Sequence, residues 1–302
     1  MENDPPYPVY GTTYTAFRVS PLYHRPSNPS SDLSLSQHAR RLRDVLRGDS
    51  VRGVQLSTGD SMVAPVTGTL QRCTWERFGD EPTWHRAHAF TVGEHEDDLS
   101  QSTEQPTLAE AVGIRIELQY DRAVHSALLL KDPEPSSPTP GFSSFPLLLL
   151  RMPTHLRDTV IEYLQRAFDA HIAPLRLRSA FLTASLERSF ASSPNDDLAT
   201  TDPPISGPFT AALDRYISEH LAFSLRHPAV SVIKVACAQF AFTAEGKVKI
   251  TPPMDSDQLD HSGVDLDATE RMPEWLYKVL IKEARTSQSA VAMEDVATKV
   301  AG

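Results

Sequence analysis

The chain has 302 residues, which at roughly 150 residues per domain predicts about two domains, and its net charge of −10 argues against a wholly basic nucleic-acid binder. Its 24 prolines against 13 glycines favour long, stiff connections over a glycine-rich enzyme scaffold. No apolar run approaches the roughly 20 residues that span a bilayer, and the acidic N-terminus lacks the apolar core of a signal peptide, so we expect a soluble intracellular protein whose two cysteines, Cys73 and Cys237, are reduced.

The first half, residues 10–131, is predicted to be an α+β domain. Its helix is expected at 34–47, because leucines and an alanine recur at i, i+4, i+7 and i+11 and Gly48 follows as a C-terminal cap. Its strands are recognised by β-branched and aromatic residues or by apolar–polar alternation. They are expected at residues 14–19, 51–56, 69–78, 87–92, 113–120 and 124–130. The last two are separated by a hairpin-length connection and should pair antiparallel.

The second half, residues 145–285, is expected to follow a proline-rich linker at 132–144 and to precede a tail at 286–302. Helices are predicted at 154–170, 179–190, 208–226 and from Pro273 onward, and strands at 147–150, 175–177, 230–242 and 247–250. Thr154 should cap the first of these helices. The predicted fold class is therefore α+β: a curved, mostly antiparallel β-sheet with packed helices and two loosely separable halves.

The sequence lacks the common motifs of enzyme chemistry. It contains no P-loop and no dinucleotide-binding or nucleophile-elbow pattern, and the closest serine context, around Ser61, lacks the final glycine of such an elbow. His85, His88 and His95, with Cys73 upstream, could suggest a metal site. However, His85 and His88 fall in a segment that resembles a strand, where residues i and i+3 point to opposite faces. We therefore expect no catalytic residue, no metal and no cofactor, and interpret these histidines as exposed polar residues.

Two further features have a structural and a functional interpretation. The helix 208–226 has an apolar stripe that should face a core, formed by Phe209, Leu213, Tyr216, Ile217 and Leu221. His220 lies within this stripe and is interpreted as a hydrogen-bonded core residue rather than a catalyst. The acidic segment Asp255–Asp267 lacks the glycine and the oxygen ligands that an EF-hand loop needs. It is interpreted as a solvated loop that could instead contact a basic partner.

A basic ridge is predicted on and just after the helix 34–47. It consists of Arg40, Arg41, Arg43, Arg47 and Arg52. Three of these arginines, at i, i+3 and i+7, share a helix face, and arginine forks suit phosphate geometry. The ridge is therefore a candidate nucleic-acid-binding surface. The alternative is a solvated face that Asp44 neutralises through i, i+4 and i, i+3 ion pairs.

The predicted strand 230–242 is apolar on both faces. One face carries the candidate partner-binding residues Val230, Val232, Ala236, Ala238, Phe240 and Phe242, and the other carries Ile233, Val235 and Cys237. Such a strand is either central in a covered sheet or completed by another chain, because an exposed apolar strand promotes aggregation.

Several segments in order along the chain resemble the fungal branch of the centromere protein L family. They are YTAFRVSPLY at 14–23, LRDVLRGDSVRGV at 42–54, SALLL at 126–130, PLRL at 174–177, and HPAV at 227–230 leading into KVAC at 234–237. The first two segments and their spacing carry most of the resemblance. Together the segments span roughly residues 14–250, while the acidic segments and the tail beyond about Arg285 are not part of it.

The resemblance implies a non-enzymatic structural subunit of the inner kinetochore, located at the centromere in the nucleus. Members of this family pair with centromere protein N, partly by joining β-sheets through their C-terminal halves, and some self-associate through the same surface. The pair belongs to the constitutive centromere-associated network, which holds the centromere protein A nucleosome and its DNA. On this basis the strand 230–242 would take up a partner's strand, and the ridge would contact DNA phosphates.

Two alternatives stay open. A small intracellular enzyme of a hydrolase-like kind would assemble its site from scattered residues and would need a deep polar pocket with converging titratable groups. Autonomous DNA binding through the ridge would show a steep salt dependence that Arg40→Glu and Arg43→Glu flatten.

Overall fold

The computed structural model describes residues 6–23, 32–51, 68–88, 106–107, 110–133, 141–190, 207–252 and 272–286. The chain forms two compact units. One contains Met1–Tyr7 and Arg18–Ala173, and the other contains Pro8–Phe17 and Pro174–Gly302. Each unit is α+β, and the strand pairs within each are antiparallel, so the predicted fold class is confirmed. Among the described residues, no helix is long and apolar enough to cross a membrane.

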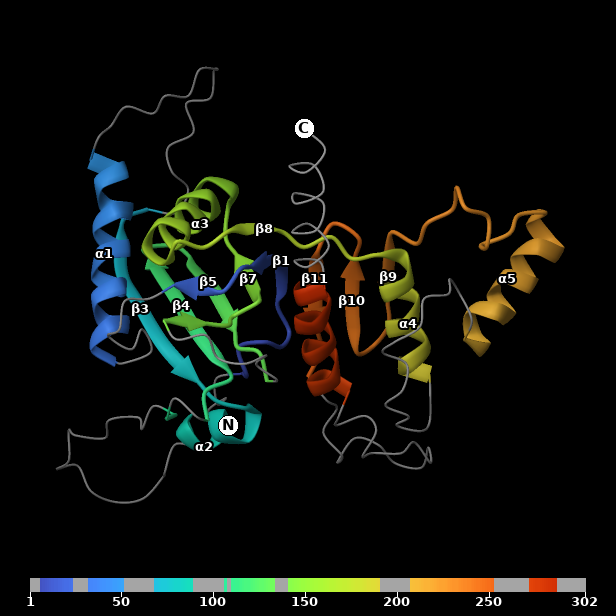
Figure 1. Cartoon of the computed structure of the whole chain (residues 1–302), viewed down its shortest axis with the longest axis horizontal. Helices are drawn as coiled ribbons and strands as arrows, with labels where there is room; N and C mark the ends of the chain where they lie inside the picture. Colours follow the sequence, from blue (N-terminus) through green and yellow to red (C-terminus); the bar gives the residue numbers. More distant parts are fainter. Residues whose placement is uncertain are drawn as a thin grey trace. The chain divides into compact units, whose positions relative to one another are not determined.

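The first unit is built on four neighbouring strands in the order β3-β4-β5-β7, with helices on both faces (Figure 1). Its main elements are α1 (Asp32–Val51), β3 (Leu70–Phe78), α2 (Glu81–His88), β4 (Gly113–Tyr120), β5 (Val124–Leu130), β7 (Leu147–Arg151) and α3 (Thr154–Phe168). A short pair, β2 (Leu22–Tyr23) and β6 (Phe142–Ser143), forms a separate two-stranded sheet in the same unit.

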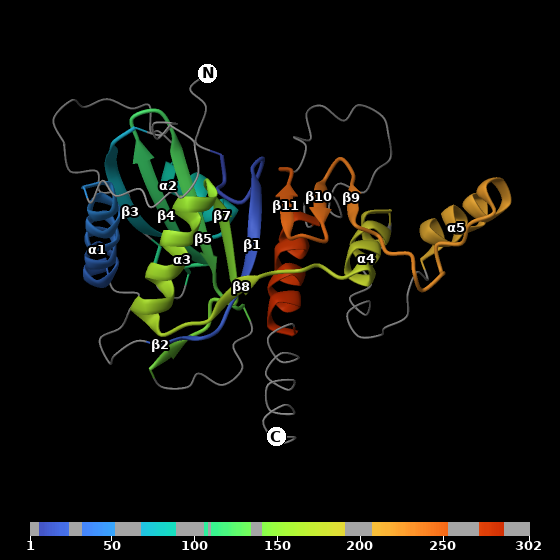
Figure 2. The same ribbon diagram turned by 90° about the horizontal axis from the view of Figure 1, so that it is seen from above.

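One face of this sheet is covered by α1 and α3, as both views show (Figures 1 and 2). Trp75 of β3 pairs in register with Ile116 of β4, so the two side chains share a face, and both are buried. The ring of Trp75 contacts His38 of α1 at 5.5 Å and Tyr163 of α3 at 6.2 Å between centroids. The alternating apolar residues of β4 therefore form the floor on which both helices pack.

The opposite face is partly covered by α2. The Arg115 guanidinium lies over the ring of Trp84 at 5.6 Å, and Tyr7 contacts the rings of both Phe78 and Trp84. Gly113 is required here by close approach, since a Cβ at this position would lie 2.4 Å from the Leu129 carbonyl oxygen and 2.9 Å from the Phe78 ring.

The strands on either side of the predicted linker 132–144 are paired with each other. Leu130 of β5 lies opposite Leu147 of β7, and the register continues to Ser126 opposite Arg151. The leucines of β7 are buried on both faces, as expected of a strand with covered faces. The linker thus lies in the chain between two strands of the first unit, and the chain passes from the first unit to the second at Ala173–Pro174.

The second unit contains the start of β1 (Thr13–Val19), followed by β11 (Lys247–Ile250), β10 (Phe240–Thr243) and β9 (Lys234–Ala236) in antiparallel order. Its helices are α4 (Ser179–Phe190), α5 (Pro208–Leu221) and a helix at 272–286. Figure 2 shows α4 and the helix 272–286 on the same side of these strands. Phe181 of α4 stacks on Phe242, and the buried Glu283 accepts two hydrogen bonds from Arg178, at 2.9 and 3.3 Å.

Several predicted boundaries were wrong. The strand predicted at 87–92 is contradicted at its start, because Ala87 and His88 belong to α2, whose first turn is stabilised by Asp80 accepting from the Thr83 N–H at 3.0 Å. Thr154 does not cap α3, since Pro153 occupies the cap position and no side chain bonds there. The strand predicted at 175–177 lies three residues earlier, as β8 (Ile172–Pro174). The strand predicted at 51–56 lies outside the described residues apart from Val51, which ends α1.

The helix predicted at 208–226 is shorter and differently placed than expected. It ends at Leu221, because Ala222 adopts a left-handed conformation with φ of 49°. Thr210 is its buried residue, whereas Phe209, Leu213, Tyr216 and Leu221 are exposed and Ile217 is only half-buried. The interpretation of His220 as a core residue is also wrong, since its side chain is exposed.

Candidate functional site

The arginines of α1 are brought together, but they lie on two sides of the helix. Arg40 and Arg43 face β3, whereas Arg41 faces α3. Arg47 lies near the end of the helix and donates a hydrogen bond from Nη2 to the Leu70 carbonyl oxygen at 3.3 Å. Arg52 lies outside the described residues. The predicted ridge is therefore a helix with basic residues on both flanks.

A groove of about 370 Å³ runs between α1 and β3. The helix contributes Ser36, Ala39, Arg40 and Arg43, and the strand contributes Arg72, Cys73, Thr74, Trp75 and Glu76. Three guanidinium groups and one carboxylate give the lining a net charge of +2 at neutral pH. Asp44 lies 3.7 Å from Arg43 and its side chain is 70% exposed, so its screening of the arginines is weak. The groove can hold an anionic group such as a phosphate.

Arg72 of β3 was missed by sequence reasoning. It lies 29 residues along the chain from Arg43, and only the packing of α1 against β3 brings it to the same groove. Spacing rules relate residues within one helix or strand. They cannot predict that a residue of β3 will lie beside a face of α1 when a long connection separates the two elements. The one indication in the sequence is that Arg72 lies in a segment whose other residues favour a β-strand, so that its charge falls on a sheet and not in a loop.

Cys73 is an unreactive thiol within this groove. Burial raises the pKa of the Cys73 thiol to about 11, so the group is protonated at neutral pH and is a poor nucleophile. Cys73 and Cys237 are both free cysteines. Within the part of the chain that the structure describes, no group of three or more His, Cys, Asp or Glu side chains could hold a metal ion.

Two of the histidines that suggested a metal site lie on a helix, although a strand was predicted for them. His85 and His88 lie on α2, where residues i and i+3 share a face, so the argument that they point apart is wrong. His85 lies 3.7 Å from Glu81, and the ring of His88 stacks on Trp84 with its Nδ1 2.8 Å from the Trp84 carbonyl oxygen. His95, Ser61 and the segment Asp255–Asp267 lie outside the described residues.

The second flank of α1 carries a groove of about 310 Å³ against α3. Its lining includes Arg41 and Val45 from α1, and Glu162, Tyr163 and Arg166 from α3. Arg166 and Glu162 form an ion pair at 2.5 Å, and both are largely exposed. Together the two grooves place cationic side chains along both sides of α1.

His38 and Tyr163 join α1 to α3 beneath these grooves. The Tyr163 hydroxyl lies 2.9 Å from His38 Nδ1 and donates to the His38 carbonyl oxygen at 3.2 Å. The His38 ring also contacts the ring of Phe168, at 4.6 Å between centroids and a tilt of 32°. Burial, together with the nearby Arg41 charge, lowers the pKa of His38, and burial raises the pKa of Tyr163 to about 12. Both groups are therefore neutral at pH 7 and fix the position of the basic helix.

The residues predicted to bind a partner do not lie on one strand face. The segment 230–242 is not a single strand but contains β9, a turn and the first part of β10, folded back in register with Val235 opposite Phe242. Val230 and Val232 are half-buried ahead of β9, whereas Ala236 in β9 and Ala238 in the turn are exposed. Phe240 and Phe242 are in the core, at 1% and 0% exposure. Core burial therefore accounts for the two phenylalanines, and Ala236 remains at the surface.

β9 has a side without a neighbour among the described strands, because its one partner there is β10. The Cys237 N–H donates to the Phe240 carbonyl at 2.9 Å, and the Ala244 N–H donates to the Ile233 carbonyl at 2.8 Å. In an antiparallel pair the bonding residues alternate, so the backbone groups of Lys234 and Ala236 point away from β10. These two residues form an edge to which an extended segment could add.

Comparison with known proteins points to one family. The family model for centromere protein L matches residues 8–203 and 200–285, which together cover most of the chain and reach both units. No curated protein matches the chain.

Proposed function

Because the chain belongs to the centromere protein L family of structural kinetochore proteins, we propose that it pairs with centromere protein N through the edge of β9. We propose further that it holds centromeric nucleosomal DNA through the basic flanks of α1. Family membership implies a role in chromosome segregation and a location at the centromere in the nucleus. The two proposed contacts use different units of the chain.

The open edge of β9 carries the first proposal. A strand that lies at a sheet edge offers unpaired N–H and C=O groups, and addition of a partner's strand satisfies them. The edge here is short, with Lys234 at its start and Ala236 at its end. Short charged edges limit unspecific pairing, which fits a strand reserved for a particular partner.

The substitution Ala236→Pro tests this pairing. Proline removes the N–H that points away from β10, while the ladder bonds of Ile233 and Cys237 stay available. We expect binding to centromere protein N to weaken by at least about tenfold, the equivalent of losing roughly 1.4 kcal/mol. Ala236→Ser keeps the N–H and should bind as the wild type does, in isothermal titration calorimetry. Wild-type affinity in the proline variant, with the fold intact by circular dichroism, would show that β9 is not the docking edge.

The groove between α1 and β3 supports the DNA contact. Arg40, Arg43 and Arg72 converge there, and arginine binds phosphate through paired N–H donors. The chain as a whole carries a charge of −10, so its long-range field does not favour DNA. We therefore propose that this contact operates within an assembled complex, in which a more basic subunit supplies most of the affinity.

The DNA contact is tested by Arg40→Glu/Arg43→Glu in the reconstituted complex. Each phosphate contact adds roughly 0.9 to the slope of log K against log salt, so removing two should lower that slope by about 2. Arg122→Glu is the control for a charge reversal outside the groove, with half the charge change of the double variant, because Arg122 is an exposed arginine in the β4–β5 turn of the same unit. An unchanged affinity and slope in the double variant would remove α1 from the DNA-binding surface.

A further inference from the structure

Exposed apolar side chains are concentrated in one part of the second unit. Of the eleven large hydrophobic side chains that are exposed among the described residues, seven lie between residues 190 and 233. Scattered apolar residues on a surface need no explanation, but a contiguous patch marks an interaction site. Four of the seven side chains belong to α5: Phe209, Leu213, Tyr216 and Leu221.

Four of the exposed residues of α5 have the spacing of a coiled-coil seam. Phe209, Leu213, Tyr216 and His220 are spaced by four, three and four residues, which is the d-a-d-a order of a heptad. Tyr216 is 59% exposed and His220 is also exposed, while Phe209 and Leu213 keep 38% and 36% of their surface exposed. Phe190 of α4 extends the seam by stacking on Phe209 at 4.6 Å. A seam of this spacing is the surface that one helix presents to another.

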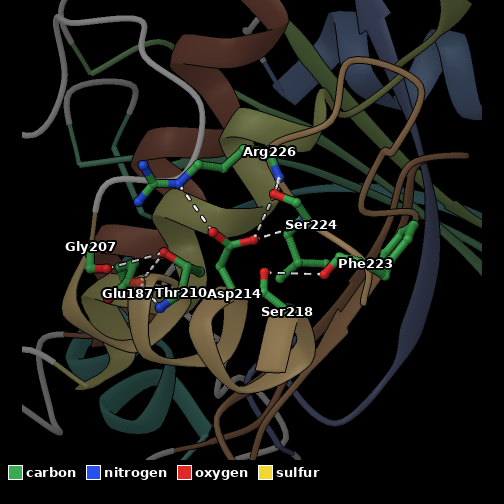
Figure 3. Close-up of polar contacts among 9 residues, drawn as sticks. Glu187, Gly207, Thr210, Asp214, Ser218, Phe223, Ser224 and Arg226 are labelled. Atoms are coloured by element: carbon green, nitrogen blue, oxygen red, sulfur yellow. Dashed lines mark hydrogen bonds and ion pairs between the residues drawn. The ribbon is translucent and has the colours of Figure 1, made fainter. Parts of the chain in front are cut away.

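The helix is attached to its own unit by other residues. At its start, the Glu187 carboxylate of α4 accepts hydrogen bonds from the N–H groups of Phe209 and Thr210 and from the Thr210 hydroxyl, at 3.2, 2.5 and 2.5 Å (Figure 3). Further along, Asp214 accepts from the Leu225 N–H at 2.7 Å and pairs with Arg226 at 3.2 Å. Thr210 and Asp214 lie about 100° around the helix from Phe209 and Leu213 respectively. The seam itself is therefore left available.

The charges around α5 are compensated within the chain. Arg215 pairs with Glu219 at 2.8 Å, and Asp214 pairs with Arg226. The seam consequently has no charged group that would attract a polyanion. Interface cores are depleted in charge and enriched in Phe and Tyr, so the chemistry of the seam fits an apolar helix face and does not fit nucleic acid.

The area of the seam indicates what kind of interface it belongs to. At roughly 200 Å² for a fully exposed large side chain, the exposed fractions of Phe190, Phe209, Leu213 and Tyr216 amount to roughly 400 Å². A standard interface buries about 800 Å² on each partner. The seam alone is too small to hold two copies of the chain together stably, but it is a substantial addition to a contact made elsewhere in the same unit.

We propose that α5 docks an amphipathic helix of the same protein whose strand adds to β9. This inference rests on the proposed function, because α5 leads directly into β9 through residues 222–233 of the same unit. The partner thereby contributes two elements: a strand for the edge of β9, and a helix with apolar residues at heptad spacing for α5.

The double substitution Leu213→Glu/Tyr216→Glu tests the inference in the full-length protein. Glutamate is a good helix former and its charge can reach solvent from both positions, which are 36% and 59% exposed, so helix content by circular dichroism should stay at the wild-type level. We expect binding to centromere protein N to weaken by at least about tenfold, as for central aromatic anchors. Ser218→Glu adds one negative charge on the opposite side of the helix, at the cost of the hydrogen bond from the Ser218 hydroxyl to the Phe223 carbonyl oxygen at 3.2 Å, and should leave the affinity unchanged.

The outcomes separate this inference from the proposed function. Wild-type affinity in the double variant, together with loss of binding in Ala236→Pro, overturns the α5 contact and leaves the β9 pairing intact. Absence of binding by the wild-type protein overturns both. Light scattering provides the second measurement: a wild-type dimer that the double variant converts to a monomer would assign the seam to a second copy and would also overturn the inference.

Discussion

Helices α3 and α5 have nearly the same length and similar apolar stripes, yet they differ in what covers them. α3 has 15 residues and buries five large side chains against the first unit: Leu156, Val160, Tyr163, Leu164 and Phe168. α5 has 14 residues and buries Thr210, while its aromatic and leucine side chains are exposed. The spacing of apolar residues identifies the face that will be covered. It does not identify whether the cover is the chain's own sheet or another protein.

The two helices are also held by different forces. Burial of a large apolar side chain contributes about 1.5–3 kcal/mol, so packing dominates the attachment of α3. The attachment of α5 relies on the carboxylates of Glu187 and Asp214, which satisfy backbone N–H groups at the helix start and in the loop that follows. A helix shorter than roughly 15 residues is marginal by itself in water, which makes these polar contacts important for α5.

Matched leucine substitutions should give the largest difference between the helices. Leu164→Ala opens a cavity under α3 and is expected to lower the free energy of unfolding by about 2–5 kcal/mol. Leu213 in α5 keeps 36% of its surface exposed, so Leu213→Ala loses less apolar burial and should lower the free energy of unfolding by about 1 kcal/mol or less. Urea titration followed by tryptophan fluorescence and circular dichroism measures both.

A comparable loss in the two variants would break the comparison, because it would mean that Leu213 packs within its own unit as fully as Leu164 does. Ile161→Ala, at a half-buried position of α3, provides an intermediate control. Its effect should fall between those of the two leucines.

Much of the fold could be predicted because local pattern and tertiary environment agree. The alternation of Ile114, Ile116 and Leu118 predicted β4, and the leucine stripe around Leu42 predicted α1, since each pattern matches a face that the unit covers. The hairpin of β9 and β10 was missed because its connection, residues 237–239, contains neither glycine nor proline. There the backbone bond between Cys237 and Phe240 makes the turn without a turn residue to reveal it.

The surfaces were harder to predict than the fold. The cationic character of α1 followed from its arginines, but their division between two flanks depends on the positions of β3 and α3, and Arg72 entered through packing. Phe240 and Phe242 suited both a core and a partner's surface, because burial and binding favour the same residue types. Only the backbone arrangement separates them from Ala236 at the edge.

Removal of the carboxylate at the start of α5 should loosen that helix. Glu187→Ala leaves the N–H groups of Phe209 and Thr210 without their acceptor, and loss of such a cap costs about 0.5–2 kcal/mol. We expect faster amide hydrogen exchange in α5 and little change in α3. The matched control is Glu162→Ala, which removes an exposed i, i+4 ion pair on α3 worth about 0.5 kcal/mol or less. Unchanged exchange in α5 would show that the cap is not what holds this helix.

Two tyrosine substitutions sharpen the comparison further. Tyr163→Phe removes the hydroxyl that bonds to His38 and should lower the free energy of unfolding by about 0.5–1.5 kcal/mol. Tyr216→Phe removes an exposed hydroxyl from α5 and should be neutral within a few tenths of a kcal/mol. Thermal unfolding of the two variants side by side provides the measurement, and equal shifts in Tm would contradict the role of the His38–Tyr163 contact.

The smallest expected effect is a pH dependence of the α1–α3 contact. Burial and the Arg41 charge lower the pKa of His38 in the folded state below its usual 6.5, and the other groups that face its ring, Trp75, Tyr163 and Phe168, supply no negative charge at neutral pH. As the pH falls below 6.5, the unfolded chain therefore takes up a proton at His38 before the folded chain does, and stability is lost. The contribution of His38 to stability is therefore complete above pH 6.5.

We expect the free energy of unfolding to fall between pH 7 and pH 5, and to fall less in His38→Gln, which cannot be protonated. Hydrogen exchange corrected for intrinsic rates should locate the change in α1 and α3 rather than in α5. An identical pH profile in the variant would mean that other groups, such as His125, whose pKa burial also lowers, account for the dependence.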